Sequence, residues 1–150
     1  EIEFSDWSSD VCSSDLNWVI GNTTRFAAAC SQRSISNWVS KCMTTDIGYY
    51  FNMDQIKADP WNSPEKMWQH SPLKYANMAK TPTLFIQSDE DYRCWMGDAI
   101  QMFSALKYFG VEARMCLFHG ENHELSRSGK PKHRIRRMTE MMEWFEKYLK

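Results

Sequence analysis

Short apolar segments alternate with amphipathic ones along most of this chain, and each apolar segment ends in a polar turn. The run Thr83–Ile86 lies between Pro82 and Gln87 and is apolar or β-branched throughout, so it predicts a strand buried on both faces. We expect further strands at Phe26–Cys30, where the residues are small and apolar, and at Val111–Phe118, where apolar positions alternate.

Helices are expected between and after these strands. Asn17–Ile20 has the character of a last helical turn, with Gly21 as its stop. Met96–Phe109 predicts a helix with one apolar face, and Pro131 opens a final helix. The expected core stripe of that final helix is Ile135, Met138, Met142, Phe145 and Leu149. Alternating strands and helices predict an α/β fold with a mainly parallel sheet flanked by helices.

A longer irregular section runs from Ile35 to Lys80 and is rich in aromatic residues. Prolines divide it into short pieces, and Ser63 followed by Pro64 predicts a helix start with Ser63 as the N-cap. The aromatic side chains could form the wall of a substrate pocket or a satellite hydrophobic cluster. The sequence leaves both interpretations open.

Composition limits the class of protein without naming its function. The 150 residues are 43% hydrophobic and 14% aromatic with a net charge of −1, which fits one domain or part of one. There is no apolar run of 18 residues, and the charge favours neither nucleic acid nor a membrane as partner. Five scattered cysteines without C-x-x-C spacing indicate free thiols in a reducing compartment.

Residues 1–16 differ from the rest of the chain. They hold five acidic residues and no Lys or Arg, and Ser8–Cys12 is nearly repeated by Ser13–Leu16. We interpret this stretch as a non-native junction or, equally, as an acidic disordered tail. The expected division is therefore residues 1–16 as that segment and residues 17–150 as a partial catalytic domain of the kind described below.

Two candidate catalytic residues follow two of the predicted strands. Asp91 comes shortly after the strand at Thr83–Ile86, and His123 comes shortly after the strand at Val111–Phe118. Because one helix separates these strands, they can be neighbours, and their carboxyl-end turns can meet. An aspartate that holds an imidazole is part of the machinery for nucleophilic catalysis, and the order acid before histidine is that of α/β-hydrolases.

Several motifs in the right order resemble the prolyl oligopeptidase family of serine peptidases, in the branch of acylaminoacyl-peptidases and dipeptidyl peptidases. They are Gln87–Arg93 (QSDEDYR), Leu117–Ser126 (LFHGENHELS), Phe26–Ser31 (FAAACS) and Ser71–Tyr75 (SPLKY), and the resemblance covers roughly residues 17–150. It implies the C-terminal half of an α/β-hydrolase fold, with Asp91 rather than Asp89 as the triad acid.

The resemblance also implies that His123, rather than His119, is the base. Other expectations from the family are hydrolysis of short peptides, no metal or cofactor, a cytoplasmic location, and an N-terminal β-propeller together with a first half of the catalytic domain that this chain lacks. A homo-oligomer is possible.

The chain departs from the family pattern in two places. Trp95 stands where the family usually has proline, which affects the turn but no triad residue. The sequence also contains no Gly-x-Ser-x-Gly elbow, and Ser13 and Ser14 lie near the expected position without its glycines. We therefore expect the parent protein to be a serine peptidase and this chain by itself to be inactive.

Other functions remain as alternatives. Another α/β-hydrolase, such as an esterase, would use the same triad, and a non-catalytic homologue could act as an interaction module. A metal hydrolase is disfavoured because the spacing from His119 to His123 crosses Gly120 and no His-Glu-x-x-His occurs. The six basic residues of Arg127–Arg137 could contact phosphate, although a solvated helix start is the simpler interpretation.

Overall fold

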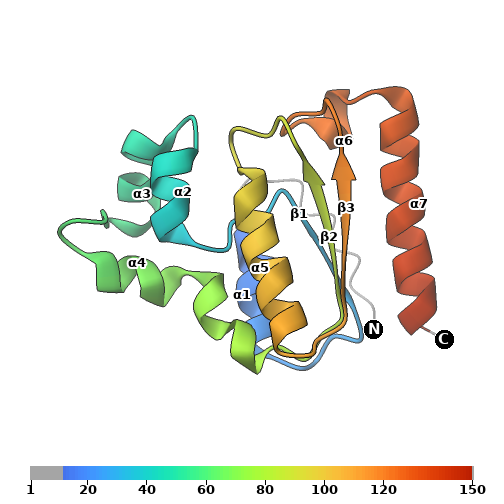
Figure 1. Ribbon diagram of the computed structural model, residues 1–150, viewed down its shortest axis with the longest axis horizontal. Coiled ribbons are helices and arrows are strands. Elements are labelled where there is room, and N and C mark those ends of the chain that lie inside the picture. The colour runs from blue at the N-terminus through green and yellow to red at the C-terminus, as the bar shows by residue number, and fades with distance from the viewer. Residues whose placement is uncertain (1–11, 150) are drawn as a thin grey trace.

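Residues 12–149 are described by a computed structural model, in which helices cover both faces of a three-stranded parallel sheet (Figure 1). In chain order the elements are α1 (Cys12–Asn22), β1 (Ala29–Gln32), α2 (Trp38–Thr44), α3 (Gly48–Ile56), α4 (Pro64–His70), the 3-10 helix η1 (Pro72–Met78), β2 (Thr83–Ser88), α5 (Met96–Tyr108), β3 (Ala113–Phe118), α6 (Leu125–Ser128) and α7 (Pro131–Tyr148). The expected α/β class is confirmed. None of the helices in the described range is long and apolar enough to cross a membrane.

Strand β2 lies at the centre of the sheet, in the order β1-β2-β3. Thr83 pairs with Ala29 on one side and with Ala113 on the other, and all six residues of β2 are buried. This burial is what the continuous apolar run predicted. Because the strands are parallel, the turns after β2 and β3 emerge at the same edge of the sheet.

The side chains of β2 alternate between two hydrophobic clusters, as the strand period of two requires. Phe85 points to the side of α1 and α5, where it packs with Met102 among other buried residues. Leu84 and Ile86 point to the opposite side and pack with Trp144 of α7. Figure 1 shows the same arrangement, with α5 and α1 on one face and α7 on the other.

Helices α2 to α4 lie beside the sheet and have a hydrophobic cluster of their own (Figure 1). Of the aromatic residues in this section, Trp38 is buried in the cluster and Phe51 packs against it, whereas Tyr49 and Trp61 are exposed, so the satellite cluster includes only some of them. Helix α4 begins at Pro64 with Ser63 at the N-cap position, as predicted. However, the Ser63 hydroxyl accepts a hydrogen bond from the backbone N–H of Asp59 and does not cap the helix.

The core stripe that the sequence predicts for α7 is wrong for most of its residues, although Phe145 is partly buried and packs against the cluster around Leu84 and Trp144. Ile135, Met138 and Met142 are 68%, 49% and 58% exposed, whereas Glu140 and Trp144 on another face are buried. The row that packs on the sheet therefore contains an acid that lies outside the predicted stripe. Glu140 can be buried there because Arg114 of β3 and Arg136 of α7 both form ion pairs with it. Glu140 and Trp144 therefore mark the face of α7 that packs on the sheet.

Element boundaries differ modestly from those predicted. Strand β1 is Ala29–Gln32, about three residues later than the predicted strand, and β3 starts at Ala113, two residues later than predicted. Helix α1 starts at Cys12, so residues 12–16 are helical although their sequence has no helical periodicity. The remainder of the stretch called a junction or tail, residues 1–11, lies outside the described residues.

Candidate active site

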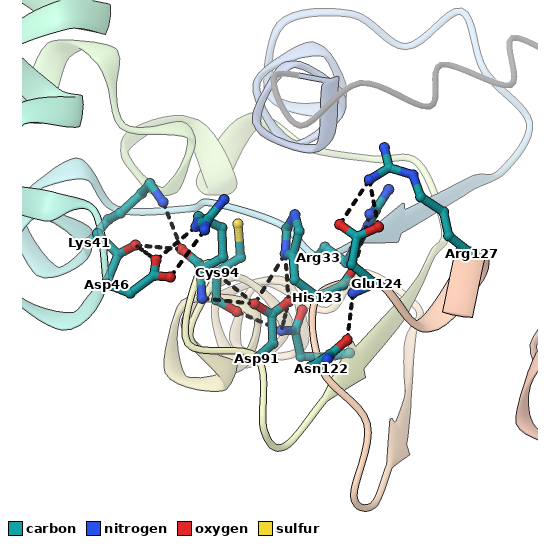
Figure 2. A network of polar contacts seen from close by, with 12 residues as sticks. Arg33, Lys41, Asp46, Asp91, Cys94, Asn122, His123, Glu124 and Arg127 are labelled. Carbon is teal, nitrogen blue, oxygen red and sulfur yellow. Dashed lines mark hydrogen bonds and ion pairs between the residues drawn. The ribbon is translucent and has the colours of Figure 1, made fainter. Parts of the chain in front are cut away.

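The turns that follow β2 and β3 meet at the carboxyl edge of the sheet, as the spacing of the two strands predicted. There, Nδ1 of His123 lies 2.9 Å from Oδ2 and 3.1 Å from Oδ1 of Asp91. Figure 2 shows the carboxylate and the imidazole pointing toward one another. The structure therefore brings together the two residues that the sequence selected as acid and base.

The carboxylate of Asp91 is held by the backbone of its own turn. Its Oδ1 accepts hydrogen bonds from the N–H groups of Arg93, at 3.0 Å, and Cys94, at 2.8 Å. The side-chain amide of Gln87 donates to Oδ2 at 3.3 Å. These donors fix the direction of the carboxylate, and the Asp91 side chain is fully buried.

The environment of His123 stabilises the imidazolium, the form that results when this residue accepts a proton. Its side chain is only 11% exposed, and this burial by itself lowers the pKa. Hydrogen bonds with Asp91 and Cys94, together with the negative charge of Asp91, outweigh burial and raise the pKa of His123 above its ordinary value. An ionised carboxylate can only accept, so Nδ1 carries a proton and Nε2 is the nitrogen that can take one from a nucleophile.

A second aspartate–histidine pair lies at the same edge. Nδ1 of His119 is 2.8 Å from Oδ2 of Asp89, and the Gly120 N–H donates to Oδ1 of the same carboxylate. The hydrogen bond from His119 lowers the pKa of Asp89. The His119 side chain is 86% exposed, in contrast to the buried His123. The distance from histidine to carboxylate is nearly the same in the two pairs, so burial of the histidine is what distinguishes them.

No metal site is formed by the described part of the chain. Among residues 12–149, no three His, Cys, Asp or Glu side chains come together as metal coordination requires. Ser13 and Ser14, which lie near the expected nucleophile position in the sequence, belong to the first turn of α1.

Sequence comparison identifies the family. Residues 16–150 match the prolyl oligopeptidase family. The chain belongs to this family. Its members are serine peptidases with an α/β-hydrolase catalytic domain, so the resemblance read from the motifs is confirmed.

Individual members of the prolyl oligopeptidase family cover nearly all of this chain. Peptidase YuxL of Bacillus subtilis is 44% identical over 133 residues, which are 89% of this chain and 20% of that protein. The acylaminoacyl peptidase of Pyrococcus horikoshii superposes with a TM-score of 0.88 at 35% identity, covering 92% of this chain and 23% of that one. An acylaminoacyl peptidase in complex with Z-Gly-Gly-Phe-chloromethyl ketone superposes with a TM-score of 0.85 at 34% identity, covering 89% and 22%. The chain thus spans about a fifth of the length of these relatives.

In this member of the prolyl oligopeptidase family, the end of α2 clamps the turn that carries Asp91. The ammonium of Lys41 and the hydroxyl of Thr45 both donate to the backbone carbonyl of Arg93, at 2.9 Å and 2.8 Å. The Arg93 guanidinium forms an ion pair with Asp46 at 2.7 Å, and its hydrogen bond lowers the pKa of Asp46. Figure 2 shows this clamp beside the Asp91–His123 pair.

Sequence reasoning missed Lys41 and Arg33 as parts of the site. Lys41 is 1% exposed and its Nζ lies 4.9 Å from the centre of the Phe51 ring. Arg33, just after β1, donates a hydrogen bond from its guanidinium to the backbone carbonyl of His123. A lone lysine or arginine beside a helix or strand gives no sign of such a role, because most such side chains are solvated.

Proposed function

We propose that this chain is the C-terminal part of the catalytic domain of a serine peptidase, in which Asp91 is the triad acid and His123 the base. The observation that carries the proposal is the buried hydrogen bond between Asp91 and Nδ1 of His123 at the carboxyl edge of a parallel sheet. In such sheets, ligands bind beyond the carboxyl ends of the strands. Residues 17–150 make up this part of the domain.

The geometry supports acyl transfer through a serine. Nε2 of His123 would accept the proton of a serine hydroxyl as that oxygen attacks the carbonyl carbon of a peptide bond. Asp91 would hold the imidazole in the correct tautomer and stabilise the imidazolium that forms. His123 would then pass the proton to the leaving amine as the carbon–nitrogen bond breaks, which leaves an acyl group on the serine. The neutral imidazole would next take a proton from the water that attacks this acyl-enzyme and return it to the serine oxygen as the acid product leaves.

The serine itself would come from a part of the protein outside this sequence. The chain contains no Gly-x-Ser-x-Gly, which would precede the helix corresponding to α1. We therefore expect peptide hydrolysis by the 150-residue chain at background level, since the triad acts as a unit and loss of the nucleophile removes most of the acceleration. A segment carrying this elbow would complete the site.

Short peptides are the proposed substrates. A relative binds Z-Gly-Gly-Phe-chloromethyl ketone, a reagent built on a tripeptide, which supports a peptide-binding site near this triad. A reducing compartment such as the cytoplasm is the proposed location. Its support is that Cys30, Cys42, Cys94 and Cys116 are all free thiols.

The test uses the complete peptidase together with the isolated chain. In the complete protein, His123→Ala and Asp91→Asn should each lower kcat for a short peptide amide by about 10⁴-fold, as removal of triad members does in other serine peptidases. The matched control is His119→Ala, which removes the other imidazole at the same sheet edge and should leave kcat within about threefold.

Two results would contradict the proposal. One is a loss of activity in His119→Ala that equals the loss in His123→Ala, because the exposed pair would then be the catalytic one. The other is turnover by the 150-residue chain that His123→Ala abolishes, because the chain would then hold its own nucleophile.

A further inference from the structure

Arg33 has an unusual backbone conformation directly after β1. Its φ is +52°, in the left-handed region that residues with a Cβ rarely adopt. Strained backbone of this kind persists only where the surrounding structure enforces it, and it concentrates at functional sites. The position of Arg33 at the carboxyl edge, directly after the strand next to β2, is consistent with such a role.

The surroundings of Arg33 fix its backbone from both sides. Its N–H donates to the carbonyl of Ile86 at 3.1 Å, which extends the β1–β2 pairing by one residue. Asn17 of α1 accepts a hydrogen bond from the Ser31 hydroxyl at 2.8 Å and donates to the Ile35 carbonyl at 3.3 Å. Asn17 thus bridges residues on either side of Arg33 and connects this stretch of backbone to α1.

The guanidinium of Arg33 reaches across the edge of the sheet to the His loop, defined here as residues 119–124. Its Nη1 donates to the backbone carbonyl of His123 at 3.0 Å, between residues that are 90 positions apart in the sequence. Figure 2 shows Arg33 beside His123, on the far side of the imidazole from the clamp formed by Lys41 and Asp46. The contact is a charge-assisted hydrogen bond to a partly buried carbonyl, one of the stronger kinds.

Backbone hydrogen bonds also hold residues of the His loop that precede His123. Glu90 donates its N–H to the Glu121 carbonyl at 3.1 Å, and the Leu125 N–H donates to the Asn122 carbonyl at 3.2 Å. At His123 itself, Asp91 holds the imidazole and Arg33 holds the carbonyl. The side chain and the main chain of this residue are therefore held by the segments that follow two different strands, β2 and β1.

We propose that Arg33 is a positioning residue for the catalytic base: by holding the His123 carbonyl, it sets the distance between the imidazole and Asp91. The proposal rests on the proposed function of Asp91 and His123. It assigns Arg33 no contact with substrate. Loss of the bond would let the His loop relax away from the β2 turn, so the hydrogen bond between Nδ1 and the carboxylate would lengthen.

When Arg33 is replaced, a positioning role and a simple charge effect predict opposite changes in the pKa of His123. Removing a nearby cation would by itself raise the pKa of a histidine, because the imidazolium would lose a repulsive neighbour. A weakened bond to Asp91 would instead lower the pKa of His123 from its raised value, since that bond is among the causes of the increase. The direction of the shift therefore separates the two effects.

The experiment is a pH titration of the histidine side chains by NMR in the ¹⁵N-labelled 150-residue chain. We expect Arg33→Met to lower the pKa of His123 toward the ordinary value of 6.5, and Arg33→Lys to lower it less. The matched control is Arg127→Met, which removes an arginine that pairs with Glu124 in the same loop and should leave His123 unchanged. In Arg33→Ala, added guanidinium at millimolar concentration should restore part of the shift.

The outcomes separate this inference from the proposed function. An unchanged or raised His123 pKa in Arg33→Met, with the Asp91→Asn variant still lowering it, would overturn the positioning role alone. An ordinary His123 pKa in the wild type that Asp91→Asn does not alter would overturn the catalytic pair and the inference with it. His133, which pairs with Glu121, reports general loss of structure. Positioning would also be refuted if Arg33→Met moved the pKa of both histidines equally and guanidinium restored nothing in Arg33→Ala.

Discussion

The buried carboxylate of Asp98 allows a sharp test of the energetics at the start of α5. Asp98 is fully buried, and its Oδ1 accepts a hydrogen bond from the Ser40 hydroxyl at 2.6 Å. Its Oδ2 is buried without a hydrogen-bond partner. Burial raises the pKa of Asp98 to about 6, although the bond from Ser40 and the charge of Lys41 act in the opposite direction. The ionised form is therefore destabilised in the folded protein.

The size of this effect follows from the two pKa values. The difference between 3.8 in the unfolded chain and about 6 in the fold corresponds to about 3 kcal/mol of destabilisation when both states are ionised. Because the folded state binds the proton more tightly, stability falls as pH rises from about 4 to 6 and then stays low. At pH 4.5 the cost of Asp98 is only about 1 kcal/mol, so about 2 kcal/mol separates pH 4.5 from pH 7.5.

The perturbation is Asp98→Asn, which keeps an acceptor for Ser40 and cannot ionise. We expect this change to raise the free energy of unfolding at pH 7.5, because the destabilising ionised carboxylate is removed. Buried amide N–H groups without a partner offset part of the gain, which leaves a net increase of about 1–3 kcal/mol. Its advantage should shrink by about 2 kcal/mol at pH 4.5. The amide penalty cancels in this comparison between two pH values, so the difference is the more reliable quantity.

The assay is urea denaturation of wild type and variant at both pH values, with Asp54→Asn as control. Asp54 is an exposed residue of α3, so its replacement should alter stability by less than about 0.5 kcal/mol at either pH. The reasoning is refuted if Asp98→Asn changes stability equally at pH 4.5 and pH 7.5. Equal slopes of free energy against urea are needed for the comparison, since they show that the unfolded states are alike.

Three further predictions concern the acid–base pair and α7. Asp91→Asn should lower the pKa of His123, observed by NMR titration, because it removes the charge that raises it; an unchanged pKa would contradict the role given to the carboxylate. Trp144→Ala should cost about 3–5 kcal/mol in urea denaturation, whereas Met142→Ala should cost less than about 0.5, and similar costs would contradict the orientation of the helix. Glu140→Ala should cost about 1–3 kcal/mol by the same measurement because its two arginine partners lose their acceptor, and a neutral result would show that the ion pairs contribute nothing.

Sequence pattern predicted the elements whose formation depends on local periodicity. The continuous apolar run of β2 and the apolar face of α5 appear where expected, because each is decided by a period of two or 3.6 residues. The meeting of Asp91 with His123 was also predictable, since both follow neighbouring parallel strands. The parallel pairing of β2 with β3 brings these two residues close together although they are far apart in the sequence.

The sequence pattern did not predict features that depend on contacts between residues far apart in the sequence. Helix α7 has an apolar stripe, yet the row that faces the sheet includes Glu140, whose burial depends on Arg114 of a different element. The roles of Lys41 and Arg33 depend on contacts with residues 52 and 90 positions away. No local period encodes such contacts, and a cation of this kind looks like a surface residue in the sequence.

The contrast between the two aspartate–histidine pairs shows why environment matters for function. Asp89–His119 and Asp91–His123 have nearly the same separation, 2.8 Å and 2.9 Å. Water around the exposed His119 screens its partner's charge and can itself exchange protons with the imidazole, so this pair gains little from the aspartate. Around His123 the same charge acts in a mostly water-excluded site, where it stabilises the imidazolium more strongly. Burial thus makes a hydrogen bond of ordinary length fit the role of base that we propose for His123, and the contacts from Lys41 and Arg33 hold the two turns.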